Sequence, residues 1–92
     1  MNALIPVDTQ FIEQVAKAVG RARMFRDASA LVEKSIGIRL DESPDAMESF
    51  DLEFDELWLA TDFESEWNRK ECIADAQAAI NKINFLLLTT LE

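Results

Sequence analysis

Apolar residues recur at helical spacing along the first third of the chain. The positions of this stripe, interrupted at Ser29, are Phe11, Val15, Ala18, Ala22, Phe25, Val32 and Ile36. Steps of three and four residues return a side chain to the same side of an α-helix, so the stripe predicts an amphipathic helix. Asp8 has the chemistry of an N-cap, and Gly37 is a residue that commonly ends a helix. Because Asp27 and Ser29 are also capping types, we expect 9–36 to form either one helix or two helices broken near 27.

A second helix is predicted over 44–60. Ser43 is a good N-cap, Pro44 suits the first helical position, and Asp45 complements the positive end of the helix dipole. One side of this helix carries the apolar residues Met47, Phe50, Phe54, Leu57 and Trp58. The fragment FDLEFD also alternates as a half-buried strand would, but the helical stripe is longer, has a start signal, and leaves no lone strand without a partner.

A third helix is predicted over 62–88, because the residues Thr61 to Glu64 have the form of a capping box. It carries two apolar stripes on roughly opposite sides. The first stripe consists of Cys72, Ile73, Ala76, Ile80, Ile83 and Leu87. The second consists of Phe63, Trp67, Ala74, Ala78 and Phe85. A surface helix needs only one stripe, so we expect this helix to lie centrally in its bundle or between its bundle and a second copy. In the second arrangement Trp67, Ala74, Ala78 and Phe85 form the self-association surface of a homodimer.

These elements predict an all-α fold, a small antiparallel bundle of three or four helices. Ninety-two residues suit one domain, assigned to 1–90, and Leu91-Glu92 has the form of a cloning junction. One Cys cannot form an internal disulfide, which favours a reducing compartment. The sequence has neither a secretory leader nor an apolar run of about 18 residues, so we expect a cytoplasmic protein that does not enter a membrane.

Charge is distributed unevenly along the chain. Residues 1–40 hold six basic and four acidic side chains, for +2, and residues 67–92 hold three of each, for zero. Residues 41–66 hold eleven carboxylates and neither Lys nor Arg, for −11, so the three parts sum to −9. A surface made acidic only for solubility would spread this charge, so the acidic block needs its own explanation.

The residue types argue against catalysis. The chain has no His and no Tyr, so a Ser or Cys nucleophile lacks its usual base. Cys72 lies on an apolar stripe, which predicts a buried, inert thiol. Asp51 begins a spacing that resembles a calcium loop, but its sixth position is Glu56 where the sharp turn needs Gly. We therefore expect no catalytic residue, no cofactor and no metal site.

Three arginines, Arg21, Arg23 and Arg26, raise the question of nucleic-acid binding. On a chain of net charge −9 they make a poor electrostatic footprint for a phosphate backbone. We expect no direct nucleic-acid contact, and we expect these arginines to face the acidic helix of the same chain or of a second copy.

The acidic helix itself has features of a contact surface. Glu48, Asp51 and Asp55 are spaced three and four residues apart, where like charges repel and destabilise a helix by about 0.2–0.5 kcal/mol per pair. Leu52 and Leu59 fall away from the core stripe, among these carboxylates. The predicted contact residues are Asp45, Glu48, Leu52, Asp55, Glu56 and Leu59. Two other interpretations stay open: the first helical segment covers the leucines, or the face is simply solvated.

The sequence thus favours a non-enzymatic acidic protein-interaction module whose partner is a basic protein surface. An inhibitor of a basic, nucleic-acid-handling protein is the favoured function, by analogy of class with immunity proteins, nucleic-acid mimics and other products of mobile elements. The alternative is a homodimeric helical adaptor whose acidic face keeps it in solution. A third hypothesis, a small-molecule binder, would use the aromatic residues Phe50, Phe54, Trp58, Phe63 and Trp67.

Overall fold

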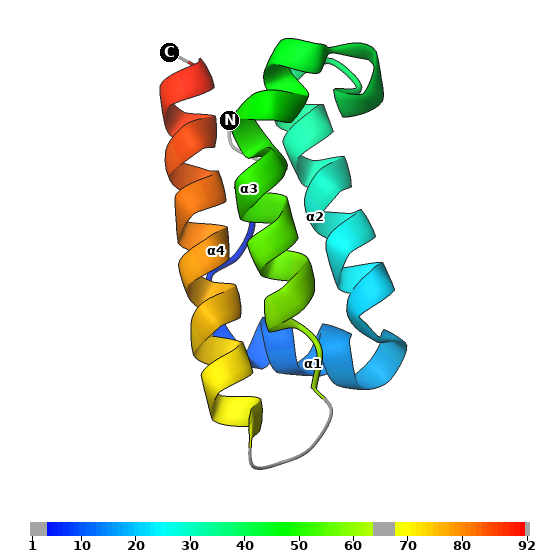
Figure 1. Cartoon of the computed structure of the whole chain (residues 1–92), viewed down its shortest axis with the longest axis vertical. Coiled ribbons are helices and arrows are strands. Elements are labelled where there is room, and N and C mark those ends of the chain that lie inside the picture. The colour runs from blue at the N-terminus through cyan, green and yellow to red at the C-terminus, as the bar shows by residue number, and fades with distance from the viewer. Residues whose placement is uncertain (1–3, 64–67, 92) are drawn as a thin grey trace.

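Three long helices stand side by side, and a shorter helix crosses one end of them (Figure 1). The computed structural model describes residues 4–63 and 68–91. Its elements are α1 (Thr9–Val19), α2 (Arg21–Ile36), the 3₁₀ turn η1 (Leu40–Glu42), α3 (Pro44–Ala60) and α4 (Arg69–Leu91). Successive long helices run in opposite directions, and the described ranges contain no strand. The predicted all-α bundle is therefore confirmed.

The first helical segment is broken at Gly20, not near 27. Gly20 has φ +84° and ψ 174°, a backbone conformation that is essentially restricted to glycine. Its N–H donates to the Ala16 carbonyl at 3.0 Å, and its own carbonyl accepts from Met24 N–H at 3.3 Å. One residue therefore ends α1 and begins α2. Asp27 stays inside α2, where its carboxylate accepts from Arg23 Nε.

The start of α4 also differs from the prediction, because Thr61 ends α3 instead of opening a new helix. The Thr61 hydroxyl donates to the carbonyls of Leu57 and Trp58, each at 3.1 Å, and its N–H donates to Leu57 as well. Asp62 and Phe63 follow in non-helical conformation, and α4 begins at Arg69. The Thr61 hydroxyl thus serves the end of α3, and Glu64, the other residue of the predicted capping box, lies outside the described residues.

The segment before α1 is tied to α4 by one side-chain amide. Asn84 Oδ1 accepts from the Ile5 N–H at 2.9 Å, and Asn84 Nδ2 donates to the Ile5 carbonyl at 2.6 Å. Ile5 is buried as a result. Asp8 then caps α1 as predicted, with its side chain accepting from Gln10 N–H.

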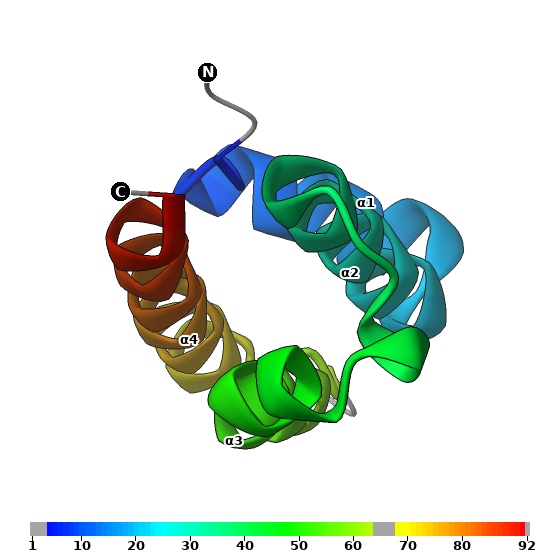
Figure 2. The same cartoon turned by 90° about the horizontal axis from the view of Figure 1, so that it is seen from above.

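The core lies along the axis enclosed by the helices (Figure 2). Its largest fully buried side chains are Ile5, Ile12, Met24, Val32, Phe50, Leu57, Ile80, Ile83 and Leu87. Phe25 of α2 packs edge-on against Phe54 and Trp58 of α3, with ring centroids 5.5 and 5.3 Å apart. The aromatic residues of α3 are thus engaged with one another and with α2, and Phe25 and Phe54 border a hollow of about 200 Å³ between the two helices.

α4 contacts all three other helices, and most extensively α3. Of its first stripe, Ile73, Ala76, Ile80, Ile83 and Leu87 are buried, whereas Cys72 is half-buried. On its second stripe Ala74, Ala78 and Phe85 are exposed. The prediction that this helix is central within its own bundle is therefore wrong, because three helices cover only one side of it.

Two leucines on α3 test this division between core and surface. Leu57 is 0% exposed and Leu59 is 69% exposed. We expect Leu57→Ala to lower the free energy of unfolding by about 2–5 kcal/mol, through lost burial and the cavity left behind. Leu59→Ala should change it by no more than about 0.5 kcal/mol. Urea denaturation followed by circular dichroism measures both; equal losses would contradict the assignment of these two faces.

A candidate interaction face on α3 and α4

α3 turns two leucines away from the core. Phe50, Phe54 and Leu57 are buried, whereas Leu52 and Leu59 are 64% and 69% exposed. The interpretation that the first helical segment covers these leucines is therefore wrong. They are seven positions apart, which places them on the same side of the helix about 10.5 Å apart along its axis.

The carboxylates around these leucines are largely without ion-pair partners. Glu56 is the exception, since Lys82 Nζ of α4 lies 3.3 Å from its Oε2 atom. No cationic group in the described part of the chain lies within ion-pair distance of the other carboxylates of α3, namely Asp45, Glu48, Asp51, Glu53 and Asp55. The outer side of α3 thus keeps its negative charge.

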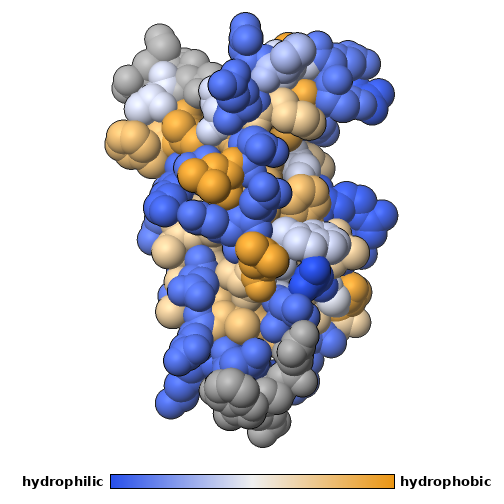
Figure 3. Space-filling view, in the orientation of Figure 1, coloured by the Kyte–Doolittle hydropathy of each residue, from blue (hydrophilic) through white to orange (hydrophobic). Residues whose placement is uncertain are grey.

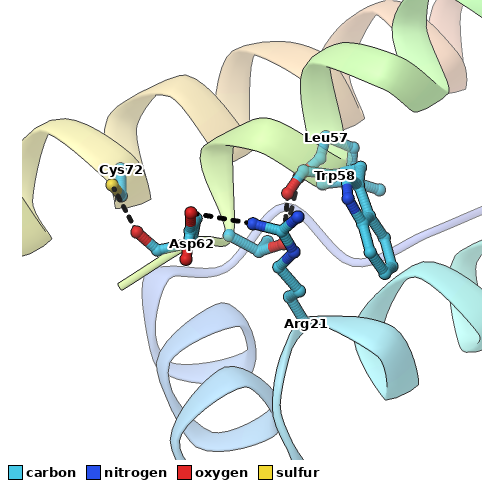
Figure 4. Close-up of polar contacts among 6 residues, drawn as sticks. Arg21, Leu57, Trp58, Asp62 and Cys72 are labelled. Atoms are coloured by element: carbon cyan, nitrogen blue, oxygen red, sulfur yellow. Dashed lines mark hydrogen bonds and ion pairs between the residues drawn. The ribbon is translucent and has the colours of Figure 1, made fainter. Parts of the chain in front are cut away.

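The arginines of α2 do not neutralise this surface. Arg21 pairs with Asp62 beyond the end of α3, at 2.9 Å, and its guanidinium lies 4.4 Å from the Trp58 ring centroid (Figure 4). Arg23 pairs with Asp27 of its own helix. Arg26 is exposed. Among the described residues, Arg21 is the one of these three arginines that forms an ion pair with a carboxylate of residues 41–66.

The outer side of α4 carries the residues predicted for self-association. Ala74 and Ala78 are exposed, and Phe85 is 66% exposed. Trp67, the fourth predicted residue, lies outside the described residues. Leu88, which sequence reasoning did not include, is 54% exposed and adds apolar surface to the same helix.

A groove between α3 and α4 joins the two predicted surfaces. It has a volume of about 430 Å³ and is lined by Glu56, Leu59, Ala60, Cys72, Asp75, Ala78 and Lys82. The lining thus includes two residues of the predicted partner surface and one of the predicted self-association surface. Apolar side chains stand among hydrophilic ones over these helices in Figure 3.

The Glu56–Lys82 pair sets the register across this groove. One turn before Glu56 is Leu52, and about one turn after Lys82 is Phe85, so these two lie at the same level of antiparallel helices. Leu59 and Ala78 lie at a second level, on the other side of the ion pair. We call the surface formed by Leu52, Glu56, Leu59, Ala78, Lys82 and Phe85 the α3–α4 face.

Cys72 Sγ lies 3.7 Å from the Asp62 carbonyl at the edge of the groove (Figure 4). Cys72 is half-buried, whereas the sequence predicted a buried thiol. Within residues 4–63 and 68–91, no three Cys, Asp or Glu side chains are arranged to hold a metal ion. No helix in these ranges has the length and apolarity needed to cross a bilayer.

Comparison with known proteins yields no relative: no protein-family model, curated protein or solved structure matches this chain. The α3–α4 face supplies apolar contacts through its two exposed leucines and a shape through its groove. The other carboxylates of α3, which lie beside this face, supply a negative charge.

Like-charge repulsion on α3 can be tested at Asp51. Asp51 lies three residues after Glu48 and four before Asp55, and shares a surface hollow with Glu33 and Asp41. Asp51→Lys should raise the free energy of unfolding by about 0.5–1 kcal/mol, since two repulsive pairs become attractive. Asp51→Asn should give a smaller gain.

Urea denaturation at low and high salt measures this effect. The native protein should gain stability as salt screens the repulsion, and the Lys variant should gain less. A Lys variant less stable than the native chain would show that Asp51 makes favourable contacts, and the repulsion argument would be wrong.

Proposed function

We propose that this chain is a non-enzymatic interaction module that binds a basic protein through the α3–α4 face. The observation that carries the proposal is the placement of Leu52 and Leu59, each more than 60% exposed, among carboxylates of α3 that have no ion-pair partner among the described residues. Large exposed apolar side chains that are grouped and rimmed by polar residues mark protein-interaction sites.

The balance of stability supports a surface kept for binding. Glu48, Asp51 and Asp55 repel one another on the same helix, and Lys or Arg at any of these positions would relieve that repulsion. A stabilising substitution is thus easy to find here, yet residues 41–66 contain neither Lys nor Arg. Such an arrangement is expected where function and stability make opposite demands on a surface.

The favoured partner is a nucleic-acid-handling protein, which the module would inhibit. A protein that binds the phosphate backbone carries a groove or patch rich in Lys and Arg. The carboxylates of α3 present the same sign of charge as that backbone, so they complement the same patch. Leu52 and Leu59 add apolar contacts, which lengthen the lifetime of a complex. Occupation of the patch would exclude the nucleic acid.

Two variants of equal net charge separate a local charge effect from a general one. Glu48→Gln with Asp55→Asn and Gln10→Lys with Gln14→Lys each change the net charge by +2, from −9 to −7. The first pair acts on the α3 surface and the second on α1. The native chain is used at low salt to capture proteins from the source cells. The candidate partners are those that the Gln10→Lys/Gln14→Lys variant still captures and the Glu48→Gln/Asp55→Asn variant does not.

Binding kinetics of a captured partner then test the roles of charge and leucine. The Glu48→Gln/Asp55→Asn pair should slow association and reduce its salt dependence, because long-range attraction steers encounter. Leu52→Ala and Leu59→Ala should mainly hasten dissociation, with Val19→Ala on α1, another exposed apolar residue, as the control. The expected partner releases its nucleic acid on binding. Capture that is indifferent to both the α3 charges and the leucines would overturn the proposal.

The second candidate function is a homodimeric adaptor that associates through α4. The exposure of Phe85 and Leu88 favours it, since these large apolar side chains lie on the uncovered side of the helix. We expect light scattering to give a mass near 20.8 kDa, twice the 10.4 kDa of one chain, at about 100 µM. Phe85→Glu should return the mass to 10.4 kDa, whereas Val19→Glu on α1 should not. A native mass of 10.4 kDa would rule out this dimer at that concentration.

A further inference from the structure

We propose that the groove between α3 and α4 binds one basic amphipathic helix of the partner, laid along the two helices. This inference rests on the proposed function and adds the secondary structure, the apolar spacing and the charge pattern of what is bound. It concerns α4 as much as α3, whereas the binding of a basic surface could use α3 alone.

The spacing of apolar side chains favours a helix. Leu52 and Phe85 lie at one level of the face, and Leu59 and Ala78 at a second level about two helical turns away. A helix whose apolar residues recur at i, i+3 or i+4, and i+7 presents side chains at the same interval. Ala78 is small, so the bound helix can approach the floor of the groove closely.

Backbone chemistry also favours a helix over an extended peptide. A strand that enters a groove needs a sheet edge to satisfy its N–H and C=O groups. The described residues offer no strand, and the groove is lined by the side chains of two helices. A bound helix satisfies its own backbone hydrogen bonds, so the groove need only supply side-chain contacts.

Charge on the two rims predicts an asymmetric occupant. On the α3 side the groove is lined by Glu56, and on the α4 side by Lys82, which Glu56 holds, and by Asp75, which has no ion-pair partner among the described residues. Glu48 and Asp55 lie on the outer surface of α3, outside the lining of the groove. The bound helix should therefore place its Lys and Arg residues toward the outer side of α3 and toward Asp75. Opposite Lys82 it should carry an apolar or acidic residue, because a second cation there would be repelled.

The probe is a fluorescent 15-residue peptide of Leu and Lys with its leucines on one side of a helix. The control peptide has the same composition with the leucines scattered around the helix. We expect anisotropy titrations to show the amphipathic peptide binding at least about tenfold more tightly than the scattered one. It should also slow alkylation of Cys72, which lines the groove.

Matched variants on α4 separate this inference from the proposed function. Ala78→Arg obstructs the groove, and Asn81→Arg adds the same charge to the same helix at an exposed position that does not line it. We expect Ala78→Arg to lower the affinity for the amphipathic peptide at least about tenfold and Asn81→Arg to leave this affinity within about twofold of the native value. Leu59→Ala, which only removes atoms, should also lower the affinity for the peptide.

Equal affinity for the two peptides, or native affinity in Ala78→Arg, would contradict the binding of a helix in the groove. If the peptide failed to bind in the groove but Glu48→Gln/Asp55→Asn still lowered the affinity for a captured partner, the proposed function would stand and this inference would fall. Loss of the native dimer in Ala78→Arg, together with no peptide binding, would assign the groove to a second copy of this chain.

Discussion

Burial of one side of α4 is the interaction on which the rest of the structure depends. α3, α2 and α1 all contact this helix, and its buried residues Ile80, Ile83 and Leu87 belong to the same core as Phe50 and Leu57 of α3. Residues 4–63 and 68–91 contain no further helix or strand that could cover the opposite side. The exposed surface of α4 is therefore set by the shortage of partners for a long helix.

The acidic side of α3 follows from the same packing. α3 is held by the aromatic contacts with Phe25 and by its long seam with α4. Of the carboxylates on its outer side, Glu56 is the one that pairs with a cation of the described residues. Charge there costs the fold a fraction of a kcal/mol per repelling pair, which a well-packed core can tolerate. Binding chemistry can accumulate on such a surface without altering the helices that present it.

Local patterns in the sequence were sufficient for the fold class, for α3 and for the outward leucines. The helix predicted over 44–60 coincides with α3, because Ser43 and Pro44 define its start, although Ser43 makes no side-chain cap hydrogen bond. Leu52 and Leu59 could be placed because their side of the helix follows from spacing alone. A helical wheel needs no tertiary information, provided that the helix is continuous.

Other features escaped sequence reasoning for identifiable physical reasons. The break at Gly20 preserves the periodicity of the stripe on both sides, so the pattern of apolar residues carries no trace of it. A Thr hydroxyl can cap a following helix or donate back to the preceding one, and Thr61 does the second. Lys82 could not be assigned to Glu56, and the groove could not be foreseen, because both depend on the register between α3 and α4.

The amide of Asn84 has a consequence for the order in which the molecule comes apart. It holds Ile5 across 79 positions of sequence, whereas α3 and α4 are joined by a short connection. Closing a long loop costs more chain entropy than closing a short one, so the α3–α4 hairpin can assemble first and the segment bearing Ile5 is secured last. In the reverse direction, local unfolding begins where one amide and one isoleucine hold the chain. The first opening of the protein is then a release of its N-terminal segment from α4, on the side of that helix away from the groove.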